Sequence, residues 1–81
     1  DNYLCQEEKR YGKSIAANTV HHIYPVEKYP ELALVAWNLL SLCAECHNKM
    51  HDRMTGELTE LGKRWQERRR AEFEKFYSDR E

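Results

Sequence analysis

The chain has 81 residues, of which 41% are hydrophobic and 33% are charged, and its formal net charge at pH 7 is −1. A domain of this size buries only about 60% of the surface that its unfolded chain exposes, so a metal, disulfides or a partner usually supplement the core. No apolar run approaches the roughly 20 residues that cross a bilayer, and the first residues lack a secretory pattern, which excludes a membrane-spanning protein. Three cysteines, with Cys43 and Cys46 close together, favour metal chelation in a reduced, cytoplasmic protein over structural disulfides.

The first third of the chain predicts irregular backbone followed by a strand. Residues 1–17 contain Cys5 and show no clear period, which predicts a turn around the cysteine and irregular structure after it. Residues 19–24 are β-branched and aromatic, and Pro25 follows them. This segment predicts a short strand that stops before the proline.

The rest of the chain predicts a second strand and two helices. One helical turn is expected at 31–35 and a strand at 37–42, which would pair with the first strand across a long connection. Residues 44–54 contain neither Gly nor Pro, which predicts the first substantial helix. A second helix is expected from about 57 to 78, and Gly62 could interrupt it. The expected packing residues of this helix are Trp65, Phe73, Phe76 and Tyr77. Trp37 and Trp65 are assigned to the core rather than to base stacking, and both roles stay open for Tyr24.

All four histidines of the chain fall into two pairs, His21 with His22 and His47 with His51. Residues four apart on a helix share one face, so the second pair could hold one ion. Such pairs are more often solvent-facing or packing residues, and the first pair could be two polar residues of a metal-free edge strand. Neighbours in a regular strand point to opposite faces, so the strand must end or bend if His21 and His22 face one point.

Residues 20–25 (Val-His-His-Ile-Tyr-Pro) and 38–51 (Asn-Leu-Leu-Ser-Leu-Cys-Ala-Glu-Cys-His-Asn-Lys-Met-His) resemble the HNH (His-Asn-His, ββα-metal) endonuclease family. The likeness runs from Cys5 to about Arg53 and is particularly close to short phage members with a Cys-x-x-Cys-His signature. It implies a single α+β domain over residues 1–81. In this domain a β-hairpin and a metal-binding helix form the ββα-metal core at about 18–54, and an additional C-terminal helix follows.

The resemblance also implies a metal-dependent DNA endonuclease that nicks one strand and leaves 5′-phosphate and 3′-hydroxyl ends. One divalent cation would be held by His21, His47 and His51. Imidazole ligands favour manganese, nickel, cobalt or zinc over magnesium, although magnesium is the abundant ion. His22 would be the general base for the attacking water, and Asn38 would tie down the loop and orient that base through a hydrogen bond.

Many relatives carry two Cys-x-x-Cys pairs that hold a structural zinc. Cys43 and Cys46 match the second pair and Cys5 matches the first position, whereas Glu8 stands where the fourth cysteine is expected. A carboxylate can bind zinc, so a site of three cysteines and one glutamate and an empty, packed thiol cluster both remain open. In a further alternative, cysteines and histidines share one closed zinc site, and the chain is a non-catalytic zinc-stabilised DNA-binding module.

Basic residues concentrate between Lys63 and Arg70. A cationic stripe there could neutralise DNA phosphates without reading sequence, or it could be a solvated helix face whose charges pair with nearby glutamates. The candidate DNA-binding residues are Lys49, Arg53, Lys63, Arg64 and Arg68. Analogy with phage relatives suggests a terminase as a partner, and the chain is expected to be a monomer or weak dimer. A small helical protein-interaction domain would leave the four histidines unexplained.

Overall fold

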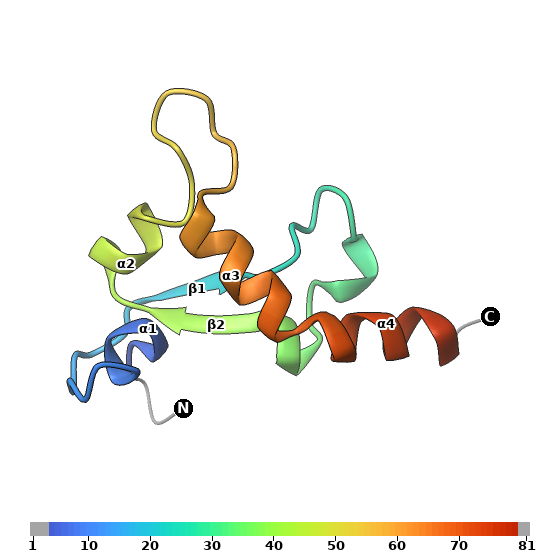
Figure 1. Ribbon diagram of the computed structural model, residues 1–81, viewed down its shortest axis with the longest axis horizontal. Helices are drawn as coiled ribbons and strands as arrows, with labels where there is room; N and C mark the ends of the chain where they lie inside the picture. Colours follow the sequence, from blue (N-terminus) through green and yellow to red (C-terminus); the bar gives the residue numbers. More distant parts are fainter. Residues whose placement is uncertain (1–3, 80–81) are drawn as a thin grey trace.

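The computed structural model describes residues 4–79, so the ends of the predicted domain, residues 1–3 and 80–81, lie outside the described residues. The fold is α+β, as predicted, and Figure 1 shows a two-stranded hairpin surrounded by short helices. The elements in chain order are α1 (Gln6–Lys9), β1 (Thr19–His22), the 3₁₀ helices η1 (Pro30–Leu32) and η2 (Ala36–Asn38), β2 (Leu39–Leu42), α2 (Ala44–Asn48), α3 (Glu60–Arg68) and α4 (Arg70–Asp79). The hairpin and α2 correspond to a ββα-metal core.

The two strands are antiparallel and shorter than predicted. They pair His21 with Leu40 and His22 with Leu39, and β1 ends at His22 rather than at residue 24. β2 begins at Leu39 rather than at residue 37, because the preceding residues form η2. One further hydrogen bond, from the Ile23 amide to the Asn38 carbonyl at 2.9 Å, follows the strand pairs, and the long connection 24–38 then leaves the sheet.

The main core lies between the hairpin and the surrounding helices. Its buried residues are Cys5, Ile23, Leu40, Leu42, Cys46, Met50 and Trp65. Helix α1, in a segment predicted to be irregular, joins this core through a buried carboxylate: the Trp65 indole N–H donates to Glu7 Oε1 at 2.9 Å, and Glu7 is only 5% exposed. The prediction that Trp65 packs in the interior is thus confirmed, and its polar group is satisfied.

Helix α2 is much shorter than the predicted 44–54. The amides of Lys49 and Met50 donate to carbonyls three residues back, at 3.1 Å each, so the helix tightens and ends. The chain then forms a loop closed by the Thr59 amide, which donates to the Met50 carbonyl at 2.9 Å. His51 lies in this loop, in an isolated bridge with Leu58, and the expectation that His51 is helical is wrong.

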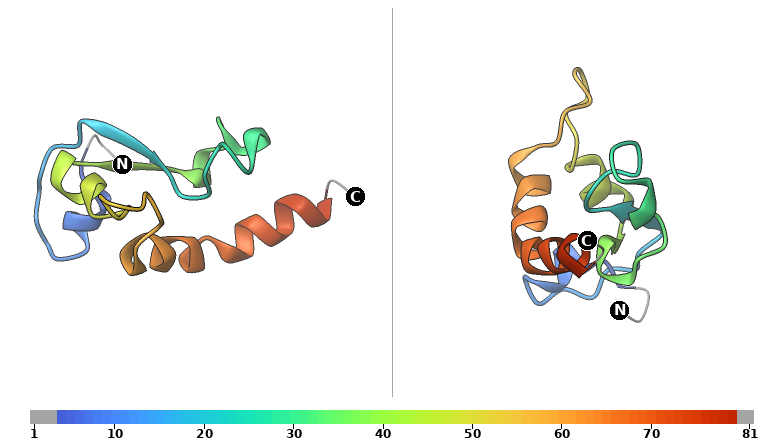
Figure 2. Two further views of the ribbon diagram at one scale, coloured as in Figure 1. Left: turned by 90° about the horizontal axis from the view of Figure 1, so that it is seen from above. Right: turned by 90° about the vertical axis from the view of Figure 1, so that its right-hand side faces the viewer.

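The C-terminal helical region is interrupted at Arg69, between α3 and α4, and not at Gly62. Figure 2 shows these helices following one another along one face of the hairpin, with α4 extending toward the C-terminus. None of the helices in the described part of the chain combines the length and apolar character of a bilayer-crossing segment. Gly62 lies inside α3 because the helix packs there against the loop that carries His51.

We expect Gly62→Ala to lower the free energy of unfolding by about 1 kcal/mol. A methyl group at this position would collide with the Leu58 side chain and lie 2.9 Å from the Met50 carbonyl oxygen. Overpacking typically costs about 1–3 kcal/mol, which exceeds the gain of at most about 1 kcal/mol in helix propensity. Urea unfolding followed by circular dichroism measures the change, with the exposed Lys63→Ala of the same helix as control. A gain in stability would show that the loop moves away freely.

Candidate active site and thiol centre

A cleft of about 270 Å³ beside the hairpin brings all four histidines together. The ring centroid of His21 lies 5.5 Å from that of His47 and 5.6 Å from that of His51. Because β1 ends at His22, both members of the adjacent pair line the same cleft. The residues lining it are Val20, His21, His22, Pro25, Val26, Glu27, His47 and His51.

His21 is the buried member of this cluster, at 2% exposure. Burial, with the neighbouring imidazoles of His47 and His51, lowers the pKa of His21 to about 4, so the ring is neutral at pH 7. Its Nε2 is buried without a hydrogen-bond partner among residues 4–79. A neutral, unpartnered ring nitrogen facing two further imidazoles fits a ligand of a divalent transition-metal ion.

His47 and His51 reach His21 from different kinds of backbone. His47 lies in the last turn of α2 and is half-buried, whereas His51 is exposed in the loop after the helix. The expectation that one helical face presents both rings is therefore wrong, although both rings still pack beside His21. The bridge between His51 and Leu58 holds the His51 backbone in place, as a longer α2 was expected to do.

The ring of His22 is held by the backbone of the connection 24–38. Its Nε2 lies 3.0 Å from the carbonyl oxygen of Ala33. A carbonyl only accepts, so Nε2 carries the hydrogen of this bond, and in the neutral ring Nδ1 carries the lone pair. For the half-buried neutral ring of His22, this bond selects the tautomer that can accept a proton at Nδ1.

Asn38 is fully buried and ties the two ends of this connection together. Its Oδ1 accepts from the Tyr24 amide at 2.7 Å, and its Nδ2 donates to the carbonyls of Tyr24 at 3.0 Å and Leu32 at 3.2 Å. The predicted loop-tying geometry is present. The hydrogen bond expected between Asn38 and His22 is replaced by one from His22 to the carbonyl of Ala33, the residue after Leu32. Sequence reasoning missed this partner because a backbone carbonyl has no residue signature.

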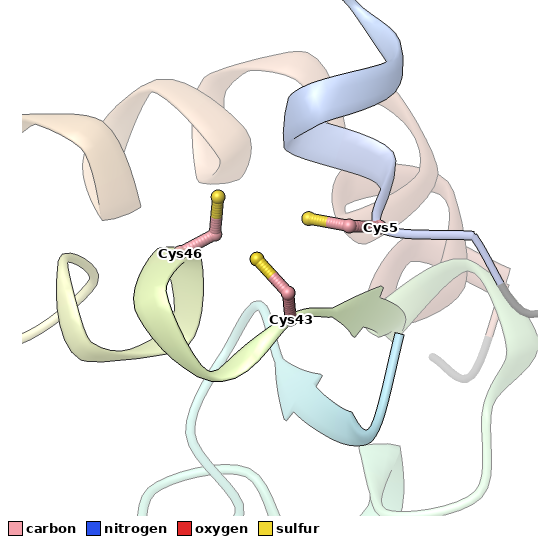
Figure 3. Close-up of side chains that lie close together, drawn as sticks. All are labelled: Cys5, Cys43 and Cys46. Carbon is pink, nitrogen blue, oxygen red and sulfur yellow. The ribbon is translucent and has the colours of Figure 1, made fainter. Parts of the chain in front are cut away.

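The three cysteines form a second cluster of potential ligands, and all three are free thiols. Figure 3 shows the three sulfurs turned toward one another, from the start of α1, the end of β2 and helix α2. Their sulfur atoms all lie within 4.8 Å of one another. Burial and the surrounding thiols raise the pKa of Cys46, whereas the backbone amides of Cys43 and Glu8 lower that of Cys5 against the effect of burial. Soft thiol donors at this spacing fit a zinc ion.

Glu8 lies at the edge of the thiol cluster, as its place in the sequence suggested. Its Oε1 accepts from the Cys46 thiol at 3.5 Å, and its Oε2 pairs with Lys13 at 3.6 Å. The half-buried carboxylate is therefore within reach of the fourth ligand position. No cysteine lines the histidine cleft, so the two clusters are separate.

The candidate DNA-binding residues lie around the histidine cleft and along α3. Arg53, His47 and His51 line a cleft of about 260 Å³, and Lys63 and His51 line one of about 540 Å³. His51 lines all three clefts, so the site is open on more than one side. Lys49 and Arg64 are exposed.

Some basic side chains on the C-terminal helices already form ion pairs with glutamates of the same helices. Arg70 pairs with Glu67 at 3.4 Å and with Glu74 at 3.1 Å, as the solvated-face alternative anticipated. The guanidinium of the exposed Arg68 lies 4.9 Å from the centre of the Trp65 ring. Among the candidate basic residues, Arg53 and Lys63 line clefts that they share with the histidines, and Lys63 also pairs with Glu60 at 3.8 Å.

Comparison with known proteins agrees with this arrangement. No curated protein and no solved structure is significantly similar to the chain. The sequence model of the HNH endonuclease family matches residues 4–53, well over half of the chain. The matched range contains the four histidines, Asn38 and the three cysteines. The chain therefore belongs to the HNH endonuclease family.

Proposed function

We propose that the chain is a metal-dependent DNA endonuclease, with His22 as general base and His21, His47 and His51 as ligands of one divalent cation. The observation that carries this proposal is the hydrogen bond between His22 Nε2 and the Ala33 carbonyl. It leaves a lone pair on a ring that lines the same cleft as the three other imidazoles. A base and a ligand set in one open cleft are what hydrolysis of a polymer requires.

The chain's own residues would act in two ways. His22 Nδ1 would accept a proton from the water that attacks phosphorus, and Asn38 would keep the connection 24–38 in place around it. When bound, the cation would stabilise negative charge on the phosphoryl oxygens and on the departing 3′ oxygen. The expected products are a nick with 5′-phosphate and 3′-hydroxyl ends.

The open clefts around His51 would hold the DNA backbone. Arg53 and Lys63 line the two clefts that flank the histidines, and Lys49 is exposed at the end of α2. Contacts of these residues with phosphates, extended by Arg64 and Arg68 on α3, would give an affinity that falls with salt. Such contacts position the duplex without selecting a sequence.

We further propose that Cys5, Cys43, Cys46 and Glu8 hold a structural zinc within one domain of residues 1–81, whose metal-binding core is about 18–54. The spacing of the thiols and the contact of Glu8 with Cys46 support this assignment. A cytoplasmic, phage-encoded nuclease that works with a terminase is the context that the family resemblance suggests. Failure of a terminase to bind the chain or to stimulate nicking would count against that context.

The metal requirement tests the proposed function directly. After chelation, wild type should not nick supercoiled plasmid, and manganese should restore nicking. His51→Ala should lower manganese affinity, measured by calorimetry, at least about tenfold, since even residues that only support a ligand cost 10- to 100-fold. The exposed Lys75→Ala on α4 should change neither property. Nicking without metal would contradict the mechanism, and DNA binding without any cleavage would favour the zinc-stabilised binding module.

A further inference from the structure

Helix α4 lies outside the range that matches the family, yet it packs against the connection that holds His22. Six aromatic residues, here called the aromatic cluster, make this contact. Three belong to the connection 24–38 and three to α4. They are Tyr24, Tyr29, Trp37, Phe73, Phe76 and Tyr77.

Phe73 is at the centre of this contact. Its ring is stacked on Tyr24, with centroids 4.2 Å apart and planes inclined by 23°. Its ring also lies nearly perpendicular to that of Tyr29, with centroids 5.2 Å apart. One side chain of α4 thus contacts two residues of the connection, and the first of them is only two residues from His22.

The remaining contacts lie on both sides of Ala33 in the sequence. Before Ala33, the Tyr77 hydroxyl donates to Glu31 Oε1 at 2.7 Å. After it, Trp37 meets Phe76 with centroids 6.3 Å apart. Because α4 contacts the connection on both sides of Ala33, it restricts where the Ala33 carbonyl can lie.

We propose that α4 is a positioning element for His22, with Phe73 as its central positioning residue. By fixing the connection 24–38, the helix keeps the Ala33 carbonyl at the 3.0 Å distance that holds His22 Nε2 and leaves Nδ1 able to accept a proton. The catalytic consequence rests on the proposed function, whereas the effect on the ring of His22 does not.

Tyr24 is the member of the aromatic cluster that packs against the main core, whereas the aromatic residues of α4 lie outside that core, which makes the proposal testable. No described residue of α4 is buried, and none belongs to the core cluster that includes Cys5, Cys46 and Trp65. Truncation of Phe73 should therefore leave the thiols and the buried His21 in place. A change at His22 would then report on the connection and not on general unfolding.

The first test is the tautomer of His22 in Phe73→Ala, measured by ¹⁵N NMR of the imidazoles at about pH 8, where an ordinary histidine is neutral. Wild type should show well-separated Nδ1 and Nε2 resonances for His22, the signature of one fixed tautomer. In Phe73→Ala these resonances should move toward each other, and Phe73→Tyr should restore the separation. The exposed Tyr11→Ala is a matched aromatic truncation and should resemble wild type.

The second test separates positioning from binding. Phe73→Ala should lower kcat for nicking about tenfold or more, with KM and manganese affinity within about twofold of wild type, because a misplaced base loses rate rather than binding. An unchanged His22 tautomer with unchanged kcat would overturn the proposal, as would loss of manganese affinity in parallel. If wild type itself does not nick, the proposed nuclease function fails, and the tautomer measurement still decides the role of α4.

Tyr77→Phe keeps the proposal testable if Phe73→Ala does not fold. This variant removes only the hydroxyl that donates to Glu31 and keeps the ring in place. A smaller change in the His22 resonances in the same direction is expected. Resonances identical to those of wild type in this folded variant would overturn the proposal.

Discussion

His22→Ala is expected to lower the rate of DNA nicking by about 100- to 10,000-fold, the usual contribution of a positioned general base. The ring is held at Nε2 by the Ala33 carbonyl, so its Nδ1 lone pair is the group that the substitution removes. Manganese affinity should stay within about twofold of wild type, because His22 is assigned to the base and not to the ion. Conversion of supercoiled plasmid to open circles at saturating manganese measures the rate, and calorimetry measures the affinity.

The comparison with His21→Ala makes this prediction sharp, since the two residues are adjacent and line the same cleft. His21→Ala should lose manganese affinity and nicking together. It also replaces a ring that is 2% exposed, so its folded state must be checked by circular dichroism. If His22→Ala loses manganese as His21→Ala does, the base has been assigned to the wrong residue. If it nicks at the wild-type rate, His22 is not the base.

The different roles proposed for His21 and His22 follow from where β1 ends. Residues within a strand alternate between faces, and His21, paired with Leu40, is turned into the protein, where burial keeps it neutral. His22 is the last residue of β1, so the chain after it is free to turn back and place the Ala33 carbonyl beside its Nε2. Neighbours in a regular strand point to opposite faces, but β1 ends at His22, so both histidines can line one cleft.

Apart from α1, which lies in a segment predicted to be irregular, the order of the main strands and helices could be predicted from the sequence, but the lengths of several elements could not. The β-branched segment before Pro25 and the Gly-free segment after Cys43 gave the hairpin and α2 in the right places. Helix α2 ends early because the loop after it pairs with the residues before α3, a tertiary contact without a local signal. Gly62 predicts an interruption of the helix for the same reason, since its use as a close-packing position depends on Leu58 and the Met50 carbonyl.

The same distinction applies to the candidate site, where side-chain chemistry could be predicted from the sequence and tertiary contacts could not. Histidine and cysteine side chains carry their chemistry in their residue type, so the sequence could nominate both clusters of potential ligands. The partner of His22 is a carbonyl, and every residue has one, so nothing at Ala33 distinguished it. The role of α4 was equally hidden, because Phe73 reads as an ordinary packing residue until its stacking on Tyr24 is seen.

Cys46→Ser is expected to abolish tight zinc binding and to unfold most of the chain. Structural zinc sites bind with apparent free energies of about 10–16 kcal/mol, comparable to or larger than the whole stability of a domain, about 5–15 kcal/mol. The thiols join α1, the end of β2 and α2, so loss of the ion would release three elements at once. Zinc content by mass spectrometry and helicity by circular dichroism, before and after chelation, measure the two effects.

Glu8 decides between the two interpretations of the thiol cluster. If zinc is held by three thiols and this carboxylate, Glu8→Gln should weaken zinc binding at least about tenfold, whereas Tyr11→Ala should not. If the cluster is packed and metal-free, Glu8→Gln should change little, because its contact with Cys46 is a single weak hydrogen bond at 3.5 Å. Purified wild type would then contain no zinc, and Cys46→Ser would lose only part of its stability. The zinc proposal would fail on that result, while the histidine cleft, which no cysteine lines, would keep its own test.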